Sequence, residues 1–336
     1  MHAGKRFTFL EFAVWTRRDV YKLLVLAVVP TVLFAVLDWK FLSISWVPIA
    51  LLGTAVSLIV GFKNNAAYGR AWEARQIYGG IINTSRAFGV MVRDFLAATD
   101  PAAARTIFYR HFGWLTALRY QLREPRVWET QSSEQNAEYQ HTYYRIPERE
   151  TPLDEALRPF LAPDEQTFIL ARKNRATQLL ARQSAQLNGL QRAGHLTEFQ
   201  LSQIQAQLTA LYDQQGRAER IKNFPYPRNF SSITTYLLYM FVALVPYGLL
   251  KEFATIGAGT DLDGRTIWLN IPFALVLTWV FVALDRVGDS SMNPFEGGAN
   301  DVPITNISRI IEIDLREMLG ETDLPPAITP VNQILL

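Results

Sequence analysis

The sequence predicts an all-α membrane protein with four transmembrane helices per subunit and a large helical cytosolic domain. The chain has 336 residues, of which 49% are hydrophobic and 19% are charged, and the charges are unevenly spread. No Asp, Glu, Lys or Arg occurs in residues 23–37, 42–62, 229–250 or 266–284. Because a charge at the centre of a membrane helix costs about 2.5–3.5 kcal/mol, each charge-free window predicts a transmembrane span.

The first two spans differ in how well they are defined. The window at 23–37 is short and contains Pro30, and it extends to Trp39 if Asp38 lies at the membrane interface. The window at 42–62 runs without an interrupting proline into the polar segment 63–89. We therefore expect one helix that leaves the membrane and continues into water.

The long segment between the second and third spans predicts a helical domain. Apolar residues recur at helical spacing in residues 102–122, and further helices are expected at 167–190 and 196–221. Residues 124–150 contain two prolines and many polar and aromatic residues, so we expect this part to be irregular. Alternating strand patterns of useful length are not found in the sequence.

The C-terminal region predicts one more helix, followed by an extended tail. Thr305 is a candidate N-cap for a helix at 305–319 that carries an apolar stripe. The tail at 322–336 contains three prolines and is expected to pack on a neighbour or to be mobile. Four regions follow from these predictions. They are 1–62 (N-terminal helix and first two spans), 63–228 (cytosolic helical domain), 229–285 (last two spans) and 286–336 (C-terminal cytosolic helix and tail).

The distribution of basic residues predicts the orientation in the membrane. The two connectors on one side hold only Lys40, Lys251 and Arg265 of the 33 Lys and Arg residues. Lys and Arg favour the cytoplasmic side. Both termini and the helical domain are therefore expected in the cytoplasm, with the spans in the plasma membrane and in contact with lipid.

Composition and motifs argue against several function classes. The chain has no cysteine, and its four histidines, at positions 2, 111, 141 and 195, are not spaced as metal ligands. A net charge of +2 gives no reason to expect a nucleic-acid partner. Because catalytic and nucleotide-binding motifs are missing from the sequence, we expect neither an enzyme nor a bound cofactor or metal.

Two stripes of the second span are candidates for helix contacts and for a pore lining. The first, of small residues spaced four apart, consists of Gly53, Ser57 and Gly61. The second, one position on, consists of Thr54, Leu58 and Phe62. Small residues let membrane helices approach closely, and bulky apolar rings around an axis can gate a pore by dewetting. The alternative is that both stripes make ordinary contacts within one subunit.

Polar residues follow directly after this span. Lys63, Asn64 and Asn65 would lie next to the end of a pore. Further on, Glu73 has helical spacing to pair with Arg70, or it could pair with a neighbouring chain. An ordinary solvated helix is the alternative interpretation of these charges.

Residues 61–89, GFKNNAAYGRAWEARQIYGGIINTSRAFG, resemble the signature of the bestrophin channels, especially their bacterial members. Three later stretches agree with this resemblance. They are ERIKNFPYP at 219–227, NPFEGGANDVP at 293–303 and RIIEIDLREMLGE at 309–321. The resemblance implies a homopentamer in the bacterial inner membrane, with an apolar neck formed by the second span and a cytosolic vestibule that ends in an aperture.

The resemblance also assigns candidate pore residues. The three neck rings fall on Thr54, Leu58 and Phe62, where Thr54 replaces the bulky apolar residue usual in the family. We expect a wetter upper neck, unless the threonine hydroxyl bonds to the helix carbonyl four residues earlier. The aperture falls on Phe199, with Gln203, one turn on, as the alternative.

The segment after Asn293 corresponds to an acidic calcium clasp in some eukaryotic members. Only Glu296 and Asp301 are acidic here, whereas calcium takes six to eight oxygen ligands. We therefore interpret 293–303 as a turn that docks the C-terminal helix, and we expect no metal. The resemblance implies passage of monovalent ions, with cations such as Na⁺ slightly favoured and chloride as the alternative. A secondary transporter or a non-conducting scaffold is the competing class.

Overall fold

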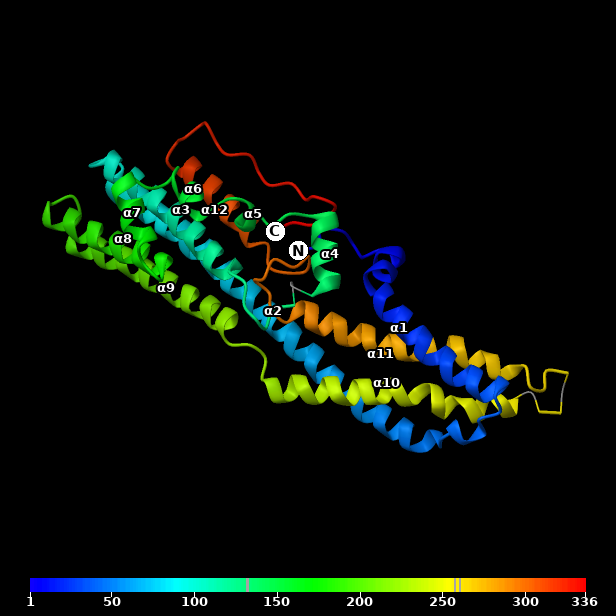
Figure 1. Ribbon diagram of the computed structural model, residues 1–336. Helices are drawn as coiled ribbons and strands as arrows, with labels where there is room; N and C mark the ends of the chain where they lie inside the picture. Colours follow the sequence, from blue (N-terminus) through cyan, green and yellow to red (C-terminus); the bar gives the residue numbers. More distant parts are fainter. Residues whose placement is uncertain (131–132, 257, 260) are drawn as a thin grey trace.

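The computed structural model describes residues 1–130, 133–256, 258–259 and 261–336, and it is almost entirely helical. Four helices at one end of the elongated molecule form the membrane bundle (Figure 1). They are α1 (Phe9–Val36), the first half of α2 (Trp46–Leu96), α10 (Arg228–Ile256) and α11 (Asn270–Ser291). All four are long and apolar enough to cross a membrane, as predicted.

Helix α2 connects the two ends of the molecule. It has 51 residues, which corresponds to a length of about 75 Å at 1.5 Å per residue. Its first half packs against α10 and α11, and its second half packs against α9 and α12. The prediction that the second span and the polar segment after it form one continuous helix is therefore confirmed.

The helical domain packs against the second half of α2, which keeps an exposed face that includes Trp72 and Val90 (Figure 1). Its longer helices are α3 (Pro101–Arg123), α8 (Arg175–Arg192), α9 (Glu198–Asn223) and α12 (Ile304–Met318). Its shorter helices are α4 (Glu134–Tyr143), α5 (Pro147–Glu150), α6 (Leu153–Leu157) and α7 (Pro163–Leu170). One apolar core joins the longer helices with α2, α6 and α7, and its largest buried side chains include Tyr78, Phe88, Phe108, Phe112 and Trp114.

The stripe of small residues on α2 serves close packing within the chain at Gly53 but not at Gly61. A Cβ atom added at Gly53 would lie 2.7 Å from the Phe241 ring of α10, so only glycine allows this close approach. Ser57 donates a hydrogen bond to the carbonyl of Gly53 at 2.8 Å. By contrast, no atom lies within 4 Å of a Cβ built at Gly61.

Two predicted segments of the helical domain were wrong in detail. Residues 124–150 are not wholly irregular, because α4 forms there with Ser133 as its N-cap and packs against α1. The helix expected over 167–190 is two helices, since α7 ends at Leu170 and α8 begins at Arg175. The second start is fixed by Asn174, whose side chain accepts a hydrogen bond from the Thr177 amide at 2.9 Å.

The C-terminal region also differs from the prediction. Helix α12 begins at Ile304 after Pro303, and the hydroxyl of Thr305 donates to Glu148 at 2.6 Å instead of capping the helix. The tail packs on its own chain. It forms an isolated bridge between Ile334 and His2, and Ile334 is buried in a cluster with Tyr144.

Candidate functional site

The membrane half of α2 has one side that its own chain leaves uncovered. Thr54, Leu58 and Phe62 lie on this side, and the Leu58 and Phe62 side chains are 59% and 62% exposed. On the other side, Val56 and Val60 are 1–2% exposed and belong to the core of the membrane bundle. The stripe chosen from sequence spacing is therefore the exposed face of a helix that is packed on its opposite side.

The hydroxyl of Thr54 is engaged within its own helix. Its Oγ1 donates a hydrogen bond to the carbonyl of Ala50 at 3.0 Å. A wetter upper neck was expected unless this hydroxyl bonds to the carbonyl four residues earlier, and that bond is the one observed. The hydroxyl proton is then not available to water in the neck. The hydroxyl of Thr54 therefore makes the exposed surface of α2 less polar than the residue type alone suggests.

Two of the three polar residues after the stripe point into the protein. The Lys63 Nζ lies 2.7 Å from Oδ1 of Asp285 and 2.7 Å from Oδ1 of Asp289, and the lysine side chain is 1% exposed. The Asn64 side chain donates to the carbonyl of Leu284 at 3.1 Å. Of the three polar residues, Asn65 alone is exposed. Lys63 and Asn64 therefore attach α2 to α11.

Arg70 holds α2 against two chain segments where the helix enters the helical domain. Its guanidinium donates to the carbonyls of Ile221, Phe224 and Met292 at 2.8, 3.0 and 2.8 Å. Glu73 forms an ion pair with Arg220 of α9. Within the chain, Glu73 therefore pairs with Arg220 and not with Arg70, the partner that helical spacing suggested.

The candidate aperture residues lie at the start of α9. This helix follows the α8–α9 turn, which lies at the end of the helical domain far from the membrane bundle (Figure 1). Thr197 and Gln200 form a capping box that fixes the first turn of α9. Phe199 in that turn is 72% exposed, whereas Gln203 is half-buried. Phe199 is thus the more prominent of the two candidates.

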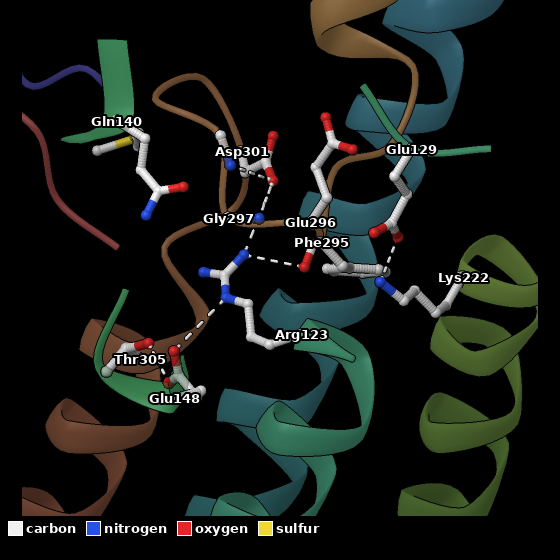
Figure 2. Close-up of polar contacts among 12 residues, drawn as sticks. Arg123, Glu129, Gln140, Glu148, Lys222, Phe295, Glu296, Gly297, Asp301 and Thr305 are labelled. Atoms are coloured by element: carbon white, nitrogen blue, oxygen red, sulfur yellow. Dashed lines mark hydrogen bonds and ion pairs between the residues drawn. The ribbon is translucent and has the colours of Figure 1, made fainter. Parts of the chain in front are cut away.

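The loop at 293–303 is anchored by a buried arginine of α3 (Figure 2). Arg123 is 2% exposed, and its Nη1 donates to the carbonyl of Phe295 at 3.0 Å. The same guanidinium lies 3.7 Å from carboxylate oxygens of Asp301 and Glu148. Because Glu148 also accepts from Thr305 in α12, this cluster joins the loop to both helices. The geometry agrees with the interpretation of the loop as a docking turn.

The two acidic residues of the loop serve local structure (Figure 2). Asp301 accepts hydrogen bonds from the amides of Gly297 and Gly298 at 2.7 and 2.9 Å. Glu296 accepts from the amide and hydroxyl of Thr130 at 2.9 and 2.8 Å. Over the part of the chain that the structure describes, no group of three or more His, Asp or Glu is placed to hold a metal ion.

The buried carboxyls of this loop predict a pH-dependent stability. Burial, together with the charge of Asp301, raises the pKa of Glu296 to about 8. Since the folded-state pKa is raised above the unfolded value, the stabilisation is complete below about pH 4.5 and is lost as the pH rises towards 8. We expect the melting temperature of the wild type to fall between about pH 5 and 8, and to fall less in Glu296→Gln.

The matched control for this prediction is Glu124→Gln, which changes a carboxyl whose side chain is 61% exposed. Thermal unfolding of the purified protein across the pH range measures both variants. A wild-type melting temperature that is flat or rises over this range would contradict the assignment, as would equal effects of the two substitutions.

The fold and this arrangement define a polytopic α-helical membrane protein with a large helical extramembrane domain. A family profile described as Bacterial/Fungal Bestrophin protein matches residues 13–317, so the chain belongs to the bestrophin family. This is a family of channels and not of enzymes.

Curated relatives agree with this assignment. The "Voltage-dependent anion channel-forming protein mll4386" of Mesorhizobium japonicum is 26% identical and is aligned over 91% of this chain and 86% of its own length. The "Voltage-dependent anion channel-forming protein YneE" of Escherichia coli K12 is 25% identical over 84% and 80% of the two chains.

Solved structures share the fold. A bacterial bestrophin homologue from Klebsiella pneumoniae superposes with a TM-score of 0.73 at 22% identity, covering 92% of this chain and 99% of that chain. A mutant of the homologue from the same organism gives a TM-score of 0.73 at 21% identity, with coverage of 92% and 100%. The all-α bestrophin fold expected from the sequence is therefore confirmed.

Several residues that organise the site were not found from the sequence. Nothing in the sequence distinguishes Arg123 from the other arginines. Its burial depends on contacts with residues about 170 positions away, such as the carbonyl of Phe295. Lys63 was assigned as a neck-adjacent polar residue, without a partner. A usable signal was present, because Asp285 and Asp289 lie one helical turn apart directly after the last apolar window.

Proposed function

We propose that this chain is one subunit of a homopentameric channel that passes monovalent ions along the exposed stripe of α2. The single observation that carries this proposal is the stripe itself, because Leu58 and Phe62 are exposed on a helix whose opposite side is packed. Several copies arranged around an axis would place these side chains in rings. Such rings form a hydrophobic constriction that can gate by dewetting.

The same proposal includes the arrangement of the chain in the membrane. The four regions 1–62, 63–228, 229–285 and 286–336 would alternate between the bacterial inner membrane and the cytoplasm, with both termini cytoplasmic. Phe199 would then lie at the aperture farthest from the membrane, and Gln203 one turn further on. The number of five subunits rests on the resemblance to bestrophins, and the mass of the complex in detergent tests it.

For the permeant ion we propose a monovalent anion such as chloride. The sequence analysis slightly favoured cations. The proposed neck residues Thr54, Leu58 and Phe62 carry no charge, so they give no reason to prefer cations over anions. The names of the curated relatives describe anion channel-forming proteins, which favours the alternative. A neutral neck leaves ion choice to charges outside it.

Currents through the purified protein in a planar bilayer with asymmetric NaCl test both parts of the proposal. A reversal potential near the chloride equilibrium value is expected. A value near that of sodium would retain the channel and overturn the choice of ion. No current from the wild type or from a variant with a widened neck would reject the pore, and gradient-coupled saturable flux would favour a transporter.

The structure also predicts a small effect of Thr54→Val. Valine has nearly the same shape, and the hydroxyl it removes is bonded to Ala50 in the same helix at 3.0 Å. We expect a single-channel conductance within about twofold of the wild type, because the substitution keeps the shape of the side chain and removes a hydroxyl whose proton is already donated within the helix. Thr54→Ser keeps the hydroxyl and serves as the control. A several-fold loss in the valine variant alone would show that the hydroxyl wets the neck.

A further inference from the structure

A cavity of about 630 Å³ lies in the helical domain and has no role in the proposed ion pathway. It is formed by the C-terminal end of α3, the region of α5 and α6, and the connector between α7 and α8. Its volume is within the range of small-molecule sites. Five basic residues line it, namely Arg123, Arg149, Arg172, Lys173 and Arg175.

The two carboxylates that line this cavity already have basic partners on or just after α3. Glu124 lies 3.0 Å from Arg126, and Glu148 lies 2.9 Å from Arg119. Glu148 is also 3.7 Å from Arg123. Both acidic residues are therefore neutralised without the basic residues of the connector between α7 and α8.

Three of the five basic residues have no such partner. Within the described ranges, Arg172, Lys173 and Arg175 have no carboxylate oxygen within 4.0 Å. Arg175 also has a buried Nε atom without a hydrogen-bond partner. A buried donor without a partner destabilises the folded chain, so this atom indicates a place where an acceptor would be stabilising.

The surrounding structure adds positive potential and fixes part of the lining. Arg175 is the first residue of α8, an 18-residue helix whose N-terminal end carries a partial positive charge. The guanidinium of Arg172 lies over the ring of Phe168 at 4.3 Å. Stacking on an aromatic ring leaves the edge of the guanidinium available for a bidentate contact.

The remaining lining is largely apolar. Leu153, Leu170 and Pro125 contribute to it, together with Tyr120, whose hydroxyl donates to the carbonyl of Thr151 at 2.9 Å. A cavity with unpaired basic side chains on one side and apolar side chains elsewhere is suited to a small anion that carries several negative charges. Arginine forks match phosphate oxygens in geometry as well as in charge.

We propose that this cavity binds a small soluble anion with two phosphoryl groups, and that the connector before α8 supplies the main contacts. Arg172, Lys173 and Arg175 carry three unpaired positive charges, whereas one phosphate group carries a charge of only about −1.5 to −2. The shared chemistry is a pair of phosphates within one molecule. Free pyrophosphate and an organic bisphosphate are the two sources. The proposal does not depend on ion conduction, because binding can be measured on the purified protein in detergent without any current.

Isothermal titration of the full-length protein tests the site. The probes are inorganic pyrophosphate and fructose 1,6-bisphosphate, each at low and at physiological salt. We expect saturable binding of at least one probe that weakens with salt, since part of the attraction is electrostatic. Binding of pyrophosphate alone would identify free pyrophosphate as the source, and binding of the sugar bisphosphate alone would identify an organic bisphosphate.

The variant Arg172→Gln with Lys173→Gln removes two of the unpaired charges. Both side chains are exposed, so the fold is expected to persist. The control is Arg158→Gln with Arg192→Gln, which removes two charges from the same domain outside the cavity. We expect at least tenfold weaker binding in the first variant and no more than twofold in the control. Absence of binding of both probes at millimolar concentration, or equal weakening in the two variants, would overturn the proposal.

Discussion

Replacing Leu58 and Phe62 together by alanine is expected to raise the single-channel conductance several-fold. Both side chains are the large apolar members of the exposed α2 stripe, at 59% and 62% exposure. In rings around an axis, their removal widens the constriction and lowers the cost of keeping it filled with water. Because neither side chain is buried within its own chain, the subunit should lose little of its folding free energy.

A matched control separates the pore from general effects on the membrane bundle. Phe273→Ala with Leu284→Ala removes the same two side-chain types from α11, where they are 57% and 47% exposed. Planar-bilayer recordings of both double variants give the comparison. Larger conductance only in the α2 variant supports the proposed lining. Unchanged conductance in that variant, or an equal rise in both, would remove α2 from the ion pathway.

The membrane helices could be predicted from sequence because their signal is local. Each charge-free window reports directly on the cost of placing a charge in lipid. The continuity of α2 beyond Phe62 followed in the same way from the absence of an interrupting proline. The exposed stripe was also accessible, since positions four apart share one face of a helix.

The parts that failed depend on tertiary contacts. The helix predicted over 167–190 breaks at Asn174, because a side chain that also favours turns caps a new helix there. Thr305 has the residue type of an N-cap, yet its hydroxyl is taken by Glu148, which is 157 positions away. The sequence left two possibilities for the Thr54 hydroxyl, namely exposure to water in the neck or a hydrogen bond to the helix carbonyl four residues earlier. Only the structure could decide between them.

The pairing of Lys63 with Asp285 and Asp289 is the clearest example of a contact that could not be predicted from the sequence. The lysine and Asp285 are 222 residues apart, so no local pattern links them. Their sequence positions placed all three just beyond the ends of two spans, where charges are tolerated at low cost. The structure shows that the Lys63 side chain is only 1% exposed. Lys63, Asp285 and Asp289 therefore form a buried ion-pair cluster that connects α2 to α11.

Lys63→Met is expected to destabilise the folded chain strongly. It keeps an unbranched chain of similar length but leaves Asp285, whose side chain is 10% exposed, without its cation. Removing one partner of a buried ion pair costs about 3–5 kcal/mol, because the remaining charge is buried without compensation. We expect a melting temperature lower by roughly 4–7 °C in detergent, since an unfolding entropy of about 2.1 cal/mol/K per residue makes 1 kcal/mol worth about 1.4 °C in a chain of 336 residues.

The control and the rescue make this expectation specific. Lys40→Met removes an exposed lysine, 59% accessible, that pairs with Asp38, and it should cost no more than about 1 kcal/mol. Lys63→Met combined with Asp285→Asn and Asp289→Asn removes the uncompensated charges and should recover a large part of the loss. Equal melting temperatures for Lys63→Met and the wild type would mean that the ion pairs do not hold α2 to α11. A triple variant no more stable than Lys63→Met would assign the loss to packing of the lysine stem, because the charge imbalance would then be absent.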